Sequence, residues 1–320
     1  MVTIKDVAKK AGVSISTASY AINNDPRISK ETKEKILEVA KKLNYHPYAA
    51  ARNLKRKRTN NIGVFVDGFT GPVYPRIIEG IHAGSRRNNF NIIVSTGQSA
   101  KALLLERQVD GAVVIDRGLD DETLVHVAKH GVPIIVLDRD ISGKNIFTSM
   151  INNEEVSYEL IVSMIKKGYR KIGYVAGPVT SYDNLHRFKG FIKALTEYNL
   201  PTTYYYKGDF TKASGYRIGK EIIESSNDLP DFLFCANDEM AIGVLDSFRE
   251  LNIKVPDDIA IAGFDNIELS MYCTPKLTTV AIDHVKWGEE LAQALVDILV
   301  NNATTINVNT KGKIIYRESC

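Results

Sequence analysis

Cysteine is scarce in this 320-residue chain, which contains only Cys235, Cys273 and Cys320. Because these three are odd in number and widely separated, we expect neither a disulfide framework nor a structural zinc site. Long apolar stretches are also missing. No run approaches the ~20 apolar residues that span a bilayer, and the N-terminal MVTIKDVAKK lacks the apolar core of a signal peptide. We therefore expect a cytoplasmic protein without a membrane partner or a metal site.

The motifs of common enzyme classes are missing as well. The sequence contains no glycine-rich phosphate loop, no Gly-x-Ser-x-Gly elbow and no His-Glu-x-x-His zinc motif. Its six histidines are scattered, and His186 and His284 have no obvious nucleophile beside them. We therefore predict no catalytic residue and no cofactor, and keep an enzyme only as an alternative.

Positive charge is distributed unevenly along the chain. The whole sequence contains 41 Lys or Arg and 38 Asp or Glu, a net charge of +3. Residues 1–60 contain 14 Lys or Arg and 5 Asp or Glu, so they carry +9 and the remainder carries −6. This division is expected if the first segment meets a polyanion and the rest does not. A basic surface can also merely keep a helix solvated, so the charge alone does not decide.

The pattern of the first 46 residues predicts three short helices. Thr3 and Asp6 have the spacing of a capping box, ahead of apolar residues at every third or fourth position. Gly12 supplies a tight turn, and a second helix is expected to open near Ser16. Ser29 is placed to cap a third helix. This arrangement predicts a helix-turn-helix, whose second helix lies in the major groove of DNA.

Residues 3–62 resemble the N-terminal region of the lactose/galactose-repressor family of bacterial transcription regulators. The matching residues are Thr3-Ile4-Lys5-Asp6-Val7-Ala8, Ala11-Gly12-Val13-Ser14, Thr17, Ser19, Asn23, Tyr45-His46-Pro47 and Ala51-Arg52-Asn53-Leu54. The resemblance implies DNA-binding roles for Thr3, Ser14, Ile15, Ser16, Thr17, Ser19, Tyr20, Asn23, Ala51, Leu54 and Lys55. Ile15, Ser16 and Tyr20 would occupy the base-reading positions. Many relatives have an arginine in place of Tyr20, so the usual bidentate guanine contact is in question.

Two of these assignments have a structural alternative. Ile15 suits a thymine methyl group, but it could instead pack within its own domain. Residues 47–60 begin with Pro47, which suits the first turn of a helix, yet two turns are too short to be stable alone. Composition favours a frayed linker there. The resemblance implies a hinge helix that pairs with its dimer mate in the minor groove, with Leu54 as an apolar wedge.

Beyond residue 60, short apolar runs alternate with amphipathic helical stretches. The runs are 62–66, 91–95, 111–115, 133–137, 171–175, 231–235 and 259–263. Strands that are apolar on both faces are typical of buried parallel sheets. With about ten strand candidates, the pattern predicts an α/β architecture with two sheets.

This part resembles the effector-binding body of the same family, which is similar to periplasmic sugar-binding proteins. Matching motifs include Gly177-Pro178, Ala236-Asn237-Asp238, Gly263-Phe264-Asp265-Asn266 and Arg317-Glu318-Ser319. The resemblance implies two doubly wound α/β subdomains joined by three crossing strands. It divides the chain into a helix-turn-helix domain (1–46), a hinge helix and linker (47–60) and an effector-binding and dimerisation domain (61–320). The N-subdomain would span about 61–155 and 284–305, and the C-subdomain about 156–283 and 306–320.

A ligand of such sheets is expected beyond the carboxyl ends of the strands. The family's pocket, carried over by position, gives Asp138, Arg187, Asn237 and Asp265 as polar contacts and Tyr74 and Phe210 as aromatic walls. Carboxylate, amide and guanidinium groups match the hydroxyls of a sugar. Each aspartate could instead cap a loop, and Arg187 could be a structural ion-pair partner. Ser181 and Asp183 weaken a purine assignment, and the Gly- and Pro-rich segment 67–75 is expected to shape a pocket wall.

The sequence therefore predicts a homodimeric, sequence-specific DNA-binding transcription regulator that acts as a repressor. It would bind a palindromic double-stranded operator, with an affinity controlled by a small-molecule effector, a sugar or sugar derivative. One alternative is a global carbon-catabolite-type regulator that responds to a phosphorylated carrier protein. A sugar-binding protein is another.

Overall fold

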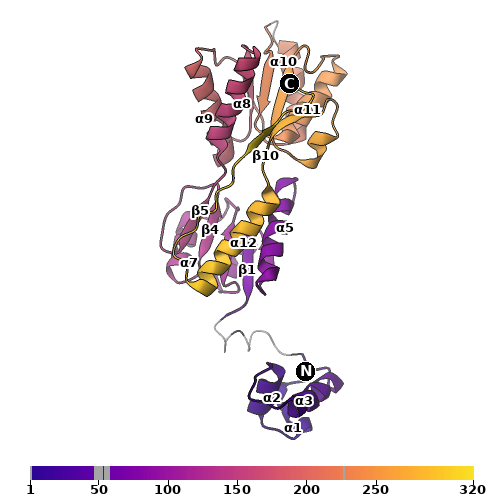
Figure 1. Cartoon of the computed structure of the whole chain (residues 1–320), viewed down its shortest axis with the longest axis vertical. Helices are drawn as coiled ribbons and strands as arrows, with labels where there is room; N and C mark the ends of the chain where they lie inside the picture. Colours follow the sequence, from indigo (N-terminus) through magenta and orange to yellow (C-terminus); the bar gives the residue numbers. More distant parts are fainter. Residues whose placement is uncertain (1, 47–52, 54–57, 226–227) are drawn as a thin grey trace. The chain divides into compact units, whose positions relative to one another are not determined.

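A computed structural model of the chain describes residues 2–46, 53, 58–225 and 228–320. It contains two compact units, Met1–Thr59 and Asn60–Cys320 (Figure 1). Each unit has its own hydrophobic core, so each is described by itself. We call the second unit the body.

The first unit contains α1 (Ile4–Ala11), α2 (Ile15–Ile22) and α3 (Lys30–Lys42). The predicted capping box of Thr3 and Asp6 is present, and Gly12 ends α1 in the left-handed conformation. Ser14 caps α2 by accepting a 3.0 Å hydrogen bond from the backbone N–H of Thr17. The core consists of Val7, Ala8, Ala11, Ala18, Ala21, Ile36 and Ala40. The helix-turn-helix expectation is therefore confirmed, with α2 beginning one residue earlier than expected.

The predicted hinge helix cannot be compared in the same way. Ala51, Leu54 and Lys55 lie outside the described residues. Their DNA-binding roles stay predictions.

The N-subdomain of the body is built on a five-stranded parallel sheet in the order β2-β1-β3-β4-β5. The strands are β1 (Asn61–Phe65), β2 (Asn91–Ser95), β3 (Gly111–Val114), β4 (Ile134–Leu137) and β5 (Ile146–Ser149). Its helices are α5 (Val73–Arg87), α6 (Gly97–Leu105), α7 (Asp121–Lys129) and α12 (His284–Asn301). α5 and α12 run side by side (Figure 1).

Two glycines explain how closely α12 approaches α5. A Cβ atom on Gly80 would overlap the carbonyl oxygen of Val285, and one on Gly288 would overlap the carbonyl oxygen of Ile77. The backbones of the two helices therefore touch, which no larger residue would allow. This contact fixes the start of α12, with His284 and Trp287, against the first sheet.

The C-subdomain contains a six-stranded sheet in the order β11-β10-β9-β8-β6-β7, in which β11 is antiparallel to β10. The strands are β6 (Ile172–Ala176), β7 (Tyr205–Lys207), β8 (Phe232–Cys235), β9 (Ala260–Asp265), β10 (Thr278–Ala281) and β11 (Lys313–Ile315). The helices α8 (Asn153–Lys167) and α9 (Tyr182–Glu197) lie on one side, and α10 (Lys212–Ser225) and α11 (Asp238–Glu250) on the other (Figure 1). A short 3-10 helix, η1 (Glu268–Met271), follows β9.

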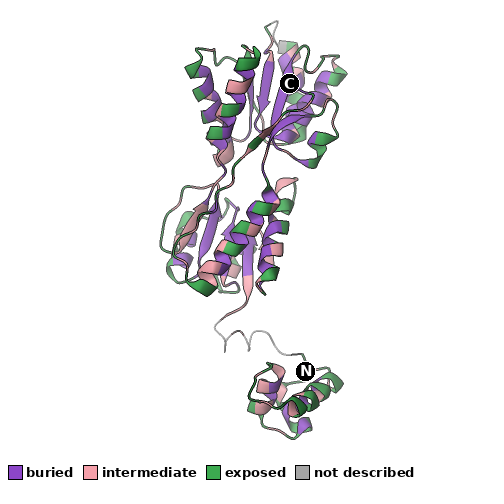
Figure 2. Cartoon of the chain, in the orientation of Figure 1, coloured by how far each residue is buried: buried purple, intermediate pink, exposed green. Residues whose placement is uncertain are grey.

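The chain passes between the two subdomains after β5, after β10 and after α12. Two of these crossing segments are hydrogen-bonded to each other. Asn152 donates its backbone N–H to the carbonyl of Thr310, and its side-chain Oδ1 accepts a hydrogen bond from the backbone N–H of Gly312. In both subdomains the central strands of the sheet are buried and the outer helix faces are exposed (Figure 2). The expected α/β body of two doubly wound subdomains is confirmed.

Candidate functional site

The exposed face of α2 presents the residues that were expected to read bases. Ile15 is 48% exposed, so it does not pack within its own domain, and Ser16 beside it is also exposed. Tyr20 and Ser19 are half-buried, and Asn23 is exposed at the C-terminal end of the helix. An apolar and a hydroxyl side chain are therefore available at the N-terminal turn of α2, the part of a recognition helix that reaches base edges.

Other predicted contact residues are already engaged in helix capping. The hydroxyl of Ser14 lies 2.8 Å from that of Thr17 and also accepts the backbone N–H of Thr17. Thr3 donates its hydroxyl to Asp6 over 2.7 Å. These groups hold the starts of α1 and α2, where backbone N–H groups also point outward and favour phosphate.

Arg27 is a candidate contact that the sequence analysis missed. Its guanidinium lies 4.2 Å above the centre of the Tyr20 ring. Asp25 fixes it there by accepting hydrogen bonds from Nε at 2.9 Å and Nη2 at 2.7 Å. Many relatives have an arginine at the position of Tyr20. In this chain the guanidinium of Arg27, from the turn after α2, lies beside that position. The only signal in the sequence was Asp25-Pro26-Arg27, in the turn that follows α2.

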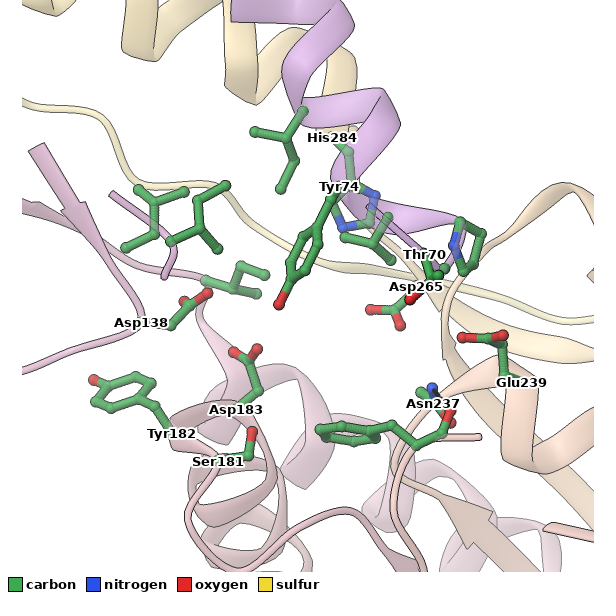
Figure 3. A pocket seen from close by; sticks show the side chains of 18 of the residues that line it. Thr70, Tyr74, Asp138, Ser181, Tyr182, Asp183, Asn237, Glu239, Asp265 and His284 are labelled. Carbon is green, nitrogen blue, oxygen red and sulfur yellow. Dashed lines mark hydrogen bonds between the residues drawn. The ribbon is translucent and has the colours of Figure 1, made fainter. Parts of the chain in front are cut away.

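A cavity of about 280 Å³ lies between the two subdomains of the body (Figure 3). All six residues expected to bind the effector line it: Tyr74, Asp138, Arg187, Phe210, Asn237 and Asp265. The side chains come from both subdomains, from the carboxyl ends of strands and from the loops and helices that follow them. This is where ligands bind in open α/β sheets.

Two of the aspartates owe their direction to unusual backbone angles. Asp138 follows β4 with φ 52°, and Asp265 ends β9 with φ 102°. Few residues other than glycine adopt such angles, so the turn that carries each carboxylate into the cavity costs conformational energy. Asn237 has a different role: it caps α11 through the N–H of Met240, and its amide donates to the carbonyl of Phe210 at 2.9 Å.

Arg187 has both of the roles considered for it: it lines the cavity, and it is a structural ion-pair partner that links neighbouring segments. The side chain is buried on α9, 3% exposed. Nε donates to Asn153 at 2.9 Å, Nη1 to the carbonyl of Ala236 at 2.5 Å, and Nη2 to Asp265 at 3.4 Å. The guanidinium also stacks 3.6 Å above the ring of Phe264. Arg187 is thus a structural ion-pair partner whose remaining donors can face a ligand.

Burial sets the charge of the other polar groups. It raises the pKa of Asp265 to about 7, although the neighbouring Arg187 lowers it. Burial, and then the nearby Asp183, raise the pKa of Asp138 well above its usual range. Burial lowers the pKa of His284 to about 4, so this imidazole is neutral near pH 7. Within the described part of the chain, Oδ1 of Asp138 and Nε2 of His284 are buried without a hydrogen-bond partner.

Aromatic rings form the apolar walls of the cavity. Tyr74 comes from α5 and Trp287 from α12, while Phe210 lies in the loop after β7. Phe210 packs so tightly over Gly177 that any Cβ atom there would overlap the ring. Residues Thr70 to Val73 also line the cavity, as expected for the segment 67–75.

Several residues that line the cavity were not predicted from the sequence. Glu239, His284 and Trp287 were missed, whereas Ser181 and Asp183 had been noted only for departing from a purine site. Figure 3 shows Asp138, Asp183 and the hydroxyl end of Tyr74 converging on one part of the cavity. Across the described residues, no cluster of His, Cys, Asp and Glu is arranged to hold a metal ion. None of the described helices is long and apolar enough to cross a membrane.

Comparisons with known proteins agree with this two-part architecture. Residues 3–48 match the model for bacterial regulatory proteins of the lacI family, and residues 162–320 match a periplasmic binding protein-like domain. A protein described as a probable HTH-type transcriptional repressor, ExuR of Bacillus subtilis, is 33% identical over 88% of this chain and 86% of its own. The HTH-type transcriptional repressor PurR of Mannheimia succiniciproducens is 30% identical over 100% of this chain and 98% of its own.

Solved structures give the same result. The lac repressor dimer bound to operator and the anti-inducer ONPF superposes with a TM-score of 0.88, 26% identity and 99% and 98% coverage of the two chains. The complex of the transcriptional regulator CelR with cellobiose gives a TM-score of 0.74 and 26% identity over the full length of both. With a helix-turn-helix unit and a two-subdomain binding body in one polypeptide, the chain belongs to the lacI family of bacterial transcription regulators.

Proposed function

We propose that this chain is a homodimeric repressor that binds a two-fold symmetric operator through α2. A small, hydroxyl-rich ligand in the cavity of the body controls its affinity for the operator. The observation that carries this proposal is the convergence of side chains from both subdomains on one cavity. A ligand that touches both subdomains binds one arrangement of them more tightly than another, and so shifts the population between them.

The DNA-binding part of the proposal is supported by α2 and by charge. Ile15 and Ser16 project from the helix start, where a recognition helix contacts base edges. The +9 charge of residues 1–60 would release counterions from DNA, so binding should weaken steeply with salt. The solved lac repressor relative is a dimer on its operator, which supports the proposed dimer and the symmetric site. Such a repressor would act in the cytoplasm, where its operator is.

The chemistry of the cavity supports a sugar or sugar derivative. Carboxylates and the remaining donors of Arg187 can exchange hydrogen bonds with hydroxyls, while Tyr74, Phe210 and Trp287 can cover the C–H face of a sugar ring. One solved relative holds cellobiose.

For a ligand to control DNA binding, a change at the cavity must be transmitted to the remainder of the body. The crossing segments can transmit such a change, since hydrogen bonds join Asn152 to Thr310 and to Gly312 between them. Any change in the relative arrangement of the subdomains must be accommodated by these segments. By linkage, a ligand that changes operator affinity by some factor must have its own affinity changed by the operator by the same factor.

The test is a thermal-shift screen of the full chain against sugars, including cellobiose, glucose, galactose and ribose, and against the purines hypoxanthine and guanine. A true ligand stabilises the folded protein by mass action. Each hit is then titrated with and without operator DNA, and the two coupling factors are compared. A hit that stabilises the chain but leaves operator affinity unchanged would contradict the proposed control.

A further inference from the structure

We propose that the ligand of this cavity is rich in hydrogen-bond donors and carries no negative charge. A neutral sugar or an amino sugar would bind, whereas its phosphorylated or uronic-acid counterpart would be rejected. This inference rests on the proposed function and narrows its ligand class. It is carried by the balance of charges in the cavity and by the buried polar atoms that still lack a partner.

Carboxylates outnumber cationic groups in the cavity wall. The carboxylates are Asp138, Asp183, Asp209, Glu239 and Asp265, and the cationic side chains are Arg117 and Arg187. Among the described residues, no lysine lines the cavity. The remaining lining side chain that could carry a positive charge, His284, is held neutral by burial and offers an anion no positive charge.

Both guanidinium groups are already paired with carboxylates. Asp265 lies 3.4 Å from Arg187, which also serves Asn153 and the Ala236 carbonyl. Arg117 donates its backbone N–H to Asp67 at 2.8 Å and its Nε to the same carboxylate at 3.3 Å. An anionic ligand would therefore have to share cations that are compensated already.

In contrast to the two guanidinium groups, three groups at the cavity have no hydrogen-bond partner among the described residues, and all three can accept a hydrogen bond. Oδ1 of Asp138 and Nε2 of His284 are buried, with no partner in the part of the chain that the structure describes. The side chain of His284 is more than nine-tenths buried and lines the cavity. Unpaired buried polar atoms are costly, so their presence in a binding site indicates groups that the ligand satisfies.

Glu239 is the third group, and it lies at another end of the wall. It is half-buried in the first turn of α11 and forms no hydrogen bond or ion pair with the described residues. A Cβ atom on Gly71 would be 3.9 Å from Oε2 of Glu239, so this carboxylate faces the segment 67–75 of the other subdomain. Figure 3 places Glu239 and Asp138 on different sides of the cavity. A bound ligand would thus meet a carboxyl group at both ends.

The consequence for a ligand follows from Coulomb's law. A phosphate or carboxylate held within ~6 Å of an ionised carboxylate is repelled strongly enough, at an effective dielectric constant near 20, to bind at least about tenfold more weakly than a neutral group. Burial raises the pKa of Asp138 and so favours its neutral form, which reduces this repulsion but supplies no positive charge. Hydroxyl or ammonium donors, in contrast, would satisfy Asp138 and Glu239 and recover the energy lost on burying them.

The experiment uses matched sugars on the full chain. Glucose, galactose and mannose are each titrated calorimetrically as the parent sugar, the 2-amino sugar, the 6-phosphate and the uronic acid, at concentrations up to about 10 mM. We expect binding by at least one parent or amino sugar, with its two anionic counterparts at least about tenfold weaker. Comparison of the parent with the amino sugar then separates a neutral ligand from a cationic one.

Charge-removing variants test the cause. Asp138→Asn and Glu239→Gln keep the size of each side chain, and each should reduce discrimination against the anionic member by about threefold or more. Glu250→Gln is the control, because Glu250 lies on the same helix as Glu239 but does not line the cavity. Unchanged discrimination in both cavity variants would overturn the proposal.

Two further results would also overturn it. One is an anionic sugar that binds as tightly as its parent, and the other is a panel in which no neutral or amino sugar binds. In either case, retained operator binding by the same preparation would leave the regulator assignment intact. Loss of operator binding as well would instead count against the proposed function.

Discussion

Replacing Arg187 by methionine should destabilise the body strongly and in a pH-dependent manner. The substitution keeps an unbranched apolar stem over Phe264 but removes the donors to Asn153, the Ala236 carbonyl and Asp265. Breaking a buried ion pair by deleting one partner typically costs about 3–5 kcal/mol, because the other charge is left uncompensated. We expect a loss of that size in the free energy of unfolding at pH 8.

The pH dependence follows from Asp265. Its folded-state pKa, about 7, lies above the ordinary value of 3.8, so the folded protein binds this proton more tightly than the unfolded chain does. Stability therefore falls as pH rises from about 4 to 7, by about 4 kcal/mol in total. Because Arg187 lowers this pKa, the Arg187→Met variant should raise it further. The cost of the substitution should then be smaller at pH 5, where Asp265 is protonated in both proteins.

The chain offers a convenient probe for this measurement. Its single tryptophan, Trp287, is 1% exposed in α12 of the body, so its fluorescence in urea reports unfolding of the body. The matched control is Arg187→Met combined with Asp265→Asn, in which the amide cannot ionise. We expect the free-energy cost of Arg187→Met, measured relative to Asp265→Asn alone, to be lower than in the wild-type background and equal at pH 5 and pH 8. In the wild-type background, a cost below about 1 kcal/mol at pH 8, or an equal cost at pH 5 and pH 8, would refute this reasoning.

Further predictions concern other parts of the chain. His284→Asn should stabilise the protein by about 2 kcal/mol at pH 5 and not at pH 8, as measured by urea titrations at both pH values. The reason is that His284 has a folded-state pKa of about 4, below the usual 6.5, so the wild type loses stability as pH falls through this range. Gly288→Ala should cost at least about 2 kcal/mol, because its Cβ would separate α12 from α5; an unchanged urea midpoint would contradict this close packing. Arg27→Ala should weaken operator binding about tenfold in fluorescence anisotropy, with Lys42→Ala, at the far end of α3, as the control. Leu54→Ala should weaken specific binding and reduce DNA bending while non-specific affinity stays unchanged; equal loss of both affinities would count against the wedge that the family resemblance implies.

Local signals account for what the sequence predicted well. The helix-turn-helix is encoded by short-range features, namely the box of Thr3 and Asp6, the turn at Gly12 and the cap at Ser14. The buried strands of the body are continuous apolar runs; Asp138 directly follows one of these strands, and Asp265 is the last residue of another. Since parallel strands end at a common edge, these carboxylates could be placed in a cleft before their contacts were known.

Features that depend on long-range packing could not be predicted in this way. β5, β7 and β11 are short and partly exposed, so they lack the apolar run of a buried strand. His284 reaches the cavity only because Gly80 and Gly288 let α12 touch α5, about 200 residues apart in sequence. Arg27 acquires its position from a stack on Tyr20, and nothing in the spacing of these residues reveals that contact.

We expect α2 to read a specific DNA sequence. This expectation is tested most directly by selecting duplexes from a random pool with the full wild-type chain and with an Ile15→Ala, Ser16→Ala variant. Both residues are exposed at the start of α2 and contribute nothing to the core of their unit. We expect the wild type to enrich a two-fold symmetric sequence and the variant to alter or lose the preference at matching positions of both half-sites. Enrichment of the same sequence by both proteins, or of none by the wild type, would contradict this expectation.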